Sequence, residues 1–154
     1  MGQTTFSGPV RSERGFTAVG SNAVVAITAE TTLTYADHVG RIIEVNDADG
    51  AVTLPTITSD TIGATYRFFI GTDATDLDVK TDGTDKFVGS LAVAGTTTKA
   101  FAPAASNDVI SMNGTTTGGD RGSIIEVTAI ATAEYMVSGT LVGSGTVVTP
   151  FADS

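Results

Sequence analysis

The feature that most constrains the fold is a series of short segments in which apolar and polar residues alternate. Residues 40–46, 77–80 and 135–142 show this pattern, and glycine, aspartate or asparagine separates such segments along the chain. A period of two residues places successive side chains on opposite faces of a β-strand. No segment carries apolar residues at helical spacing over more than a turn or two. About ten short strands with frequent turns predict an all-β fold, either an antiparallel β-sandwich or a jelly-roll-like barrel.

Residues 64–71 are the best candidate for the central strand, because they hold three of the ten aromatic residues. Tyr66, Phe68 and Ile70 share one face, which we expect to lie on the core. Arg67 and Phe69 share the other face, where a bulky apolar side chain needs cover. This second face is therefore predicted to be a subunit contact or a seat for the N-terminal segment. The expected neighbours of the core face are Ile43, Val45, Val52 and Leu54.

Two hairpins are expected. The first joins residues 40–46 to residues 51–55 through a turn at 46–50, and the second joins residues 122–130 to residues 135–142. Residues 31–36 also alternate, through Leu33 and Tyr35, and are expected to form a strand. Each predicted hairpin opens with the same four residues, Ile-Ile-Glu-Val, at 42–45 and at 124–127. This echo is too short to establish a duplication.

The N-terminal residues differ from the rest of the chain. Residues 1–20 are predicted to form an extended arm, and residues 21–154 a single β-sandwich domain. Gly8 and Pro9 interrupt any regular element, and Phe6, Val10 and Phe16 are apolar anchors between polar residues. Such anchors suggest that the arm lies extended on a surface. The alternative is a first strand that packs on its own domain.

Charge is also unevenly placed. Residues 1–16 contain Arg11, Glu13 and Arg14 and carry a net charge of +1, which leaves −10 for the remainder of a chain whose total is −9. An acidic body repels nucleic acid and anionic membranes, so neither is an expected partner. The slightly basic end suggests docking on an acidic surface.

The overall composition fits one ordered globular domain. The chain has 154 residues, of which 41% are hydrophobic and 16% charged. It contains no cysteine, which excludes disulfides and thiolate zinc sites. The N-terminus lacks the features of a secretory signal, and no apolar run is long enough to span a bilayer.

Catalytic and cofactor motifs are missing from the sequence. The single histidine, His38, is expected at the surface or rim. The sequence contains no Gly-x-Ser-x-Gly turn that could hold a serine nucleophile. A calcium loop starting near Asp47 fails because Val45 and Thr56 occupy ligand positions. An irregular calcium site remains open among the aspartates expected in turns: Asp73, Asp76, Asp78, Asp82 and Asp85. We therefore expect no enzyme activity and no cofactor, and the remaining class is surface recognition.

A set of short runs lies at both ends and in the middle of the chain: residues 5–16, 40–41, 46–48, 52–55, 63–68, 108–119 and 145–151. These runs resemble small virion structural proteins of tailed bacteriophages, in particular the head decoration, or capsid cement, proteins. The resemblance spans nearly the whole chain, and its motifs are structural rather than catalytic.

The resemblance implies a role on the outer surface of a capsid. Such proteins commonly form trimers, bridge neighbouring major capsid proteins and stabilise the expanded shell, so the implied location is the virion, with host cytoplasm during assembly. The residues expected to contact a partner are Phe6, Pro9, Val10, Arg11, Arg14, Phe16, Arg67 and Phe69. The alternatives are a tail or fibre component that binds a receptor and a carbohydrate-binding module, which the absence of tryptophan disfavours.

Overall fold

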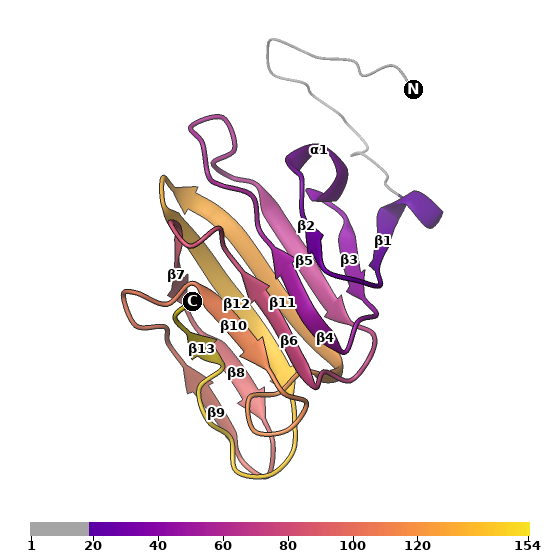
Figure 1. Cartoon of the computed structure of the whole chain (residues 1–154), viewed down its shortest axis with the longest axis vertical. Helices are drawn as coiled ribbons and strands as arrows, with labels where there is room; N and C mark the ends of the chain where they lie inside the picture. Colours follow the sequence, from indigo (N-terminus) through magenta and orange to yellow (C-terminus); the bar gives the residue numbers. More distant parts are fainter. Residues whose placement is uncertain (1–18) are drawn as a thin grey trace, which may run out of the picture.

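The computed structural model describes residues 19–154, which form two β-sheets packed face to face (Figure 1). The larger sheet, sheet A, has the strand order β1-β3-β5-β11-β12-β8-β9, and β7 also pairs with β12. Its strands are β1 (Val24–Ile27), β3 (Ile42–Val45), β5 (Thr65–Ile70), β7 (Lys86–Gly89), β8 (Leu91–Ala94), β9 (Thr98–Phe101), β11 (Asp120–Ala131) and β12 (Glu134–Val142).

The smaller sheet, sheet B, has the order β13-β10-β6-β4-β2. Its strands are β2 (Thr31–Thr32), β4 (Asp49–Thr53), β6 (Asp76–Lys80), β10 (Val109–Met112) and β13 (Phe151–Ala152). Two short helical turns complete the described elements: η1 (Ser21–Ala23) and α1 (Tyr35–His38).

The all-β sandwich expected from the sequence is confirmed. The sheets are mixed, however, since six of the eleven strand pairs among residues 19–154 run parallel. Parallel neighbours need a connection that leaves the sheet and returns. Here the chain makes that connection by crossing to the other sheet, which alternation along a single strand does not reveal.

The central strand is β5, as expected. Tyr66, Phe68 and Ile70 are buried, whereas Arg67 is exposed and Phe69 is half-buried. The predicted neighbours of the buried face belong to the same core: Ile43 and Val45 lie beside β5 in sheet A, and Val52 and Leu54 come from the chain at β4 and just after it. The Tyr66 ring also meets Tyr135 edge-on, with the ring centroids 6.4 Å apart.

The first predicted hairpin is wrong and the second is right. β3 belongs to sheet A and β4 to sheet B, so the turn between them carries the chain from one sheet to the other. β11 and β12 do form an antiparallel hairpin, and Ala133 takes a left-handed φ of 67° in its turn. Val127 and Val137, which are register partners in this hairpin, both face the core.

The prediction of a strand over residues 31–36 is also wrong beyond Thr32. Thr34 caps the single turn α1, because its hydroxyl accepts a hydrogen bond from the backbone N–H of Asp37. Leu33 is buried, while Tyr35 on the helical turn is 52% exposed. His38 is buried rather than at the surface, and its Nδ1 accepts a hydrogen bond of 3.0 Å from the Thr34 N–H. A short-range capping interaction thus overrides the two-residue alternation.

Two polar contacts fix the strand-free residues 54–64 to the end of the sandwich. The buried carboxylate of Asp85 accepts a 2.9 Å hydrogen bond from the Ile57 N–H. The Tyr135 hydroxyl donates a 2.6 Å hydrogen bond to the Pro55 carbonyl. Burial, together with the neighbouring Tyr66 and Asp85, raises the pKa of Tyr135, so this hydroxyl keeps its proton and remains a donor.

A second buried carboxylate fixes the C-terminus. Asp108 accepts hydrogen bonds from Lys86 Nζ at 2.6 Å and from the Ser154 N–H at 3.0 Å. Burial alone would raise the pKa of Asp108, but these donors outweigh it and hold the pKa below its usual range. The last residue of the chain is therefore tied to the start of β10.

Candidate functional site

The outer face of sheet A contains a hollow of about 640 Å³, here called the sheet A groove. It crosses β1, β3, β5, β11 and β12 on the side away from the core. Its volume is in the range of binding pockets in proteins. The residues that line it are Val24, Ile42, Glu44, Arg67, Phe68, Phe69, Ile124, Ile125, Glu126, Ser138 and Gly139.

Strand register arranges the outward side chains of the groove in two rows. The first row runs through Val24, Ile42, Arg67, Glu126 and Ser138. The second row runs through Ala26, Glu44, Phe69, Ile124 and Thr140.

Apolar side chains in these rows remain in contact with solvent. Val24 is 40% exposed, Ile42 47% and Ile124 53%. Single exposed hydrophobic residues are common, but a group of them in one hollow marks an interaction site.

The repeated Ile-Ile-Glu-Val segments explain the symmetry of the groove. One lies in β3, parallel to β5, and the other lies in β11, antiparallel to β5, so the two copies flank the same strand in opposite directions. Ile42 and Glu126 lie on either side of Arg67, while Glu44 and Ile124 lie on either side of Phe69. The groove therefore has an approximate local two-fold axis, in which Ile42 corresponds to Ile124 and Glu44 to Glu126.

Charge breaks this local symmetry. Arg67 Nε donates a 2.9 Å hydrogen bond to Glu126 Oε2 and forms an ion pair with it. The corresponding carboxylate, Glu44, has no ion-pair partner among residues 19–154. Within the described residues the groove therefore holds one acidic group with an ion-pair partner and one without.

Gly139 forms part of the groove floor and permits the close approach of β11 and β12. A Cβ atom at this position would lie 2.2 Å from the Ile124 carbonyl oxygen, and the φ of 151° lies in a region that L-residues rarely adopt. Only glycine fits both conditions.

The two groove carboxylates belong to strands on opposite sides of β5. Glu44 and Glu126 lie two strands and two residues apart, so regular sheet spacing puts their Cα atoms about 12 Å from each other. In addition, Glu126 is already bound by Arg67.

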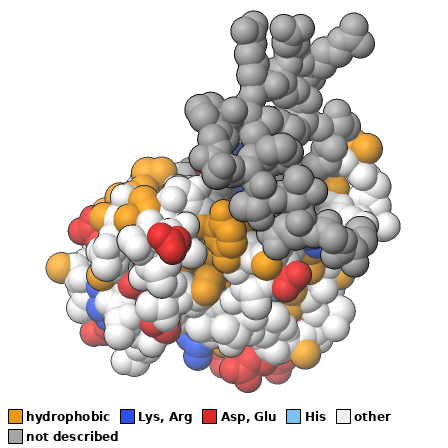
Figure 2. All heavy atoms as spheres, turned by 90° about the horizontal axis from the view of Figure 1, so that it is seen from above, with side chains coloured by type: hydrophobic (Ala, Val, Ile, Leu, Met, Phe, Trp, Pro, Cys, Tyr) orange, Lys and Arg blue, Asp and Glu red, His pale blue; other side chains and the backbone are white. Residues whose placement is uncertain are grey.

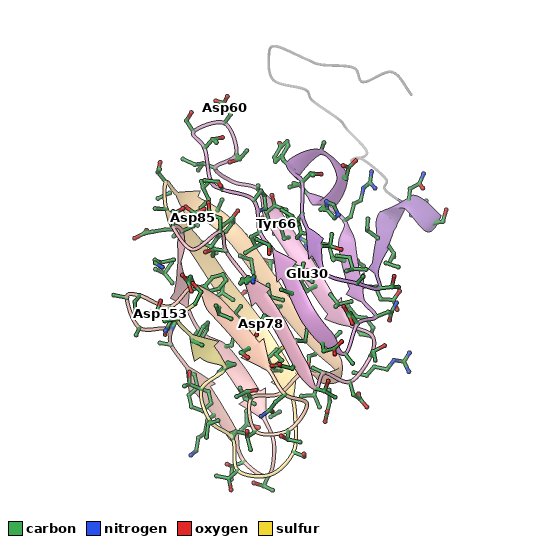
Figure 3. All side chains as sticks on the ribbon, in the orientation of Figure 1. Glu30, Asp60, Tyr66, Asp78, Asp85 and Asp153 are labelled. Atoms are coloured by element: carbon green, nitrogen blue, oxygen red, sulfur yellow. The ribbon has the colours of Figure 1, made fainter. Side chains whose placement is uncertain are left out.

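The acidic residues elsewhere do not converge on one point. Figure 3 shows Glu30, Asp60, Asp78 and Asp153 spread across the molecule, and no three potential metal ligands cluster within the part of the chain that the structure describes. The turn role expected for Asp82 is confirmed, because its Oδ1 accepts a 2.9 Å hydrogen bond from the Thr84 N–H. Burial would raise the pKa of Asp82, but hydrogen bonds from Thr56 and Thr84 lower it to about 2.

Of the residues predicted to contact a partner, Arg67 and Phe69 lie together in the groove. Phe69 is not fully buried by its own domain, so its predicted role as a contact stays open. The remaining six lie outside the described residues: Phe6, Pro9, Val10, Arg11, Arg14 and Phe16.

The sequence reasoning did not assign the groove's other side chains, among them Val24, Ile42, Glu44, Ile124 and Glu126. The repeated Ile-Ile-Glu-Val segment was the sequence feature that could have pointed to them. Its meaning depends on both copies pairing with β5, which is a property of the tertiary fold.

Comparisons with family models, curated proteins and solved structures find no match to this chain. None of the helices formed by residues 19–154 has the length and apolar character needed to cross a membrane.

Proposed function

We propose that this chain is a non-enzymatic virion structural protein that decorates and stabilises the outer surface of a phage capsid. The observation that carries the proposal is the sheet A groove, an apolar hollow built on five paired strands. A hollow on a rigid sheet suits binding of a protein surface, since its side chains are already held in place. The groove offers apolar contact and one carboxylate, Glu44, that has no ion-pair partner among residues 19–154.

The proposed partner is the major capsid protein, and the proposed assembly is a homotrimer that bridges neighbouring copies of it. This part of the proposal rests on the resemblance to capsid cement proteins. A protein that binds only the expanded shell shifts the equilibrium towards that state by mass action. The proposed location is the capsid surface, with host cytoplasm during assembly.

The surface charge is compatible with such a role. Figure 2 shows acidic side chains and exposed hydrophobic side chains on the face viewed from above, with few basic ones. A total charge of −9 keeps an abundant surface protein soluble and disfavours non-specific binding to nucleic acid.

A binding assay with expanded, empty capsids tests the proposal. We expect the protein to co-sediment with these capsids and to raise their thermal stability. Ile124→Glu should weaken binding roughly tenfold or more, because it places a charge in the apolar part of the groove. Ile62→Glu is the matched control, since Ile62 is 47% exposed but lies outside the groove.

Three outcomes contradict the proposal in different ways. Failure of the wild-type protein to bind any capsid state removes the decoration role. Equal binding by the Ile124→Glu and Ile62→Glu variants removes the groove from the contact. Binding to host cells without binding to capsids favours the tail or fibre alternative.

A further inference from the structure

We propose that the sheet A groove is the seat of the chain's own N-terminal residues 10–18. In this arrangement Val10 and Phe16 fill the apolar hollow, and an arginine of the segment pairs with Glu44. The inference concerns the isolated molecule, and a capsid protein would bind the same groove only by displacing this segment.

The first reason is where the chain enters the described structure. The described residues begin at Val19 and pass through η1 directly into β1, the edge strand of sheet A. Val24, the first residue of β1, itself lines the groove. The described chain therefore enters the domain at an edge of the hollow, where Figure 1 shows η1 and β1.

The second reason is length. The groove crosses from β1 to β12, which is four strand spacings, or about 19 Å. Nine extended residues reach about 30 Å at roughly 3.3 Å each. Residues 10–18 can thus cross the whole groove, and residues 1–9 remain to extend beyond it.

The third reason is chemical complementarity. The groove contains Arg67, Glu44 and Glu126, a net charge of −1, while residues 10–18 contain Arg11, Glu13 and Arg14, a net charge of +1. The local two-fold relation places Glu44 in a position equivalent to that of Glu126, which already pairs with Arg67. An arginine from the segment would give Glu44 the same kind of partner.

The segment also supplies apolar side chains that can cover the exposed apolar side chains of the hollow. Val10 and Phe16 are its bulkiest apolar residues. Covering Ile42 and Ile124 with them removes hydrophobic surface from water, at about 25 cal/mol for each Å² buried. A groove-to-groove contact between two copies is disfavoured by comparison, because each copy carries a charge of −9.

Paramagnetic NMR on the full chain tests the seat directly. The chain has no cysteine, so Ser12→Cys provides a single attachment site for a nitroxide label. We expect the label to broaden the methyl signals of Ile42 and Ile124 but not that of Ile110, which lies in sheet B. A label at Ser106→Cys, in the exposed connection between β9 and β10, is the control and should leave Ile42 and Ile124 sharp.

A mixing experiment distinguishes the chain's own segment from that of a neighbour. Labelled protein without NMR isotopes is mixed with isotope-enriched protein that carries no label. Broadening only when label and isotope share one chain is the expected result. Broadening in the mixture assigns the groove to the segment of a second copy and overturns the proposal, as does the absence of broadening at Ile42 and Ile124 in both samples.

Limited trypsin digestion gives a second readout, because a seated segment protects the bonds after Arg11 and Arg14. Ile124→Glu should increase cleavage at these bonds roughly tenfold relative to wild type. Ile62→Glu should leave the cleavage rate unchanged. Equal rates in all three proteins contradict the seat. Neither this assay nor the NMR experiment involves capsids, so failure here is distinct from failure of the proposed decoration role.

Discussion

At the scale of single residues, the groove depends on a position at which the fold leaves no room for a side chain. Gly139 is the clearest case, because β11 and β12 approach each other so closely that any side chain there meets the Ile124 carbonyl. Gly122 in β11 offers a comparison. It also has a positive φ, of 99°, but open space surrounds the position that its Cβ would take.

We expect Gly139→Ala to destabilise the fold by about 3 kcal/mol, since it combines backbone strain with a clash against backbone atoms. Gly122→Ala should cost only about 1 kcal/mol, because it introduces the strain alone. Urea unfolding of both variants measures the difference. Equal losses would show that the clash at Gly139 is relieved by a small shift of the strands.

Asp108 provides a residue-scale prediction that depends on pH. Asp108→Ala removes the acceptor of Lys86 Nζ and of the Ser154 N–H and should cost about 2–4 kcal/mol near neutral pH. Asp60→Ala, in an exposed loop, is the control and should change stability by less than about 0.5 kcal/mol.

The sign of the pH effect follows from the lowered pKa of folded Asp108. Its stabilisation is fully present above the pKa of the unfolded residue, about 3.9, and is lost as the pH falls through the folded value. Wild type and Asp108→Ala should therefore differ at pH 7 and converge once the pH has fallen below the folded pKa of Asp108. A constant difference in urea midpoint across this range would contradict an ionic role.

Residue-scale reasoning from sequence succeeded where it needed only one strand. The alternation around Arg67 and Phe69 identified which face of β5 is buried, and the structure bears this out. It did not identify Glu44 or Ile124 as their neighbours. Those residues lie 23 or more positions away in sequence from Arg67, and only the pairing of three strands brings them together.

At the scale of elements, the same limit explains which hairpin was predicted correctly. β11 and β12 are joined by a tight turn that leaves them no alternative partner across it. The turn after β3 looks similar in sequence but leads into sheet B, because β3 is already paired on both sides, by β1 and β5. Local alternation gives the buried face of a strand and does not give its neighbours.

The loop at residues 54–64 is the element whose position depends most on single hydrogen bonds. Tyr135→Phe removes the donor to the Pro55 carbonyl and should cost about 1 kcal/mol. We also expect faster hydrogen exchange at the Ile57 amide, because the same loop is held there by Asp85. Tyr35→Phe is the control, since Tyr35 lies on the exposed side of α1. Unchanged exchange at Ile57 in Tyr135→Phe would mean that Asp85 alone holds the loop.

At the scale of the whole molecule, the order in which the chain visits the two sheets matters most. Successive strands pass from sheet A to sheet B and back several times, and both β-sheets share one hydrophobic cluster. Neither sheet is made from a continuous piece of chain. Stability without disulfides must therefore come from completing both sheets together.

This topology predicts a single cooperative unfolding transition and slow folding. The central pair of sheet A joins β5 to β11, which are separated by about fifty residues of chain. Bringing such distant strands together costs chain entropy before core packing can stabilise the contact. Refolding should therefore take milliseconds to seconds. Far-ultraviolet circular dichroism follows the strands, and the near-ultraviolet signal of the packed Tyr66 and Tyr135 rings follows the core.

We expect the two signals to give the same midpoint in urea, because loss of either sheet exposes the common core. In the Ile62→Glu variant the two signals should still share one midpoint, since this side chain lies outside the core cluster. Loss of the tyrosine signal before the strand signal would indicate that sheet A keeps its hydrogen bonds after sheet B has separated. In that case the groove, which is built entirely on sheet A, would outlast the sandwich that supports it.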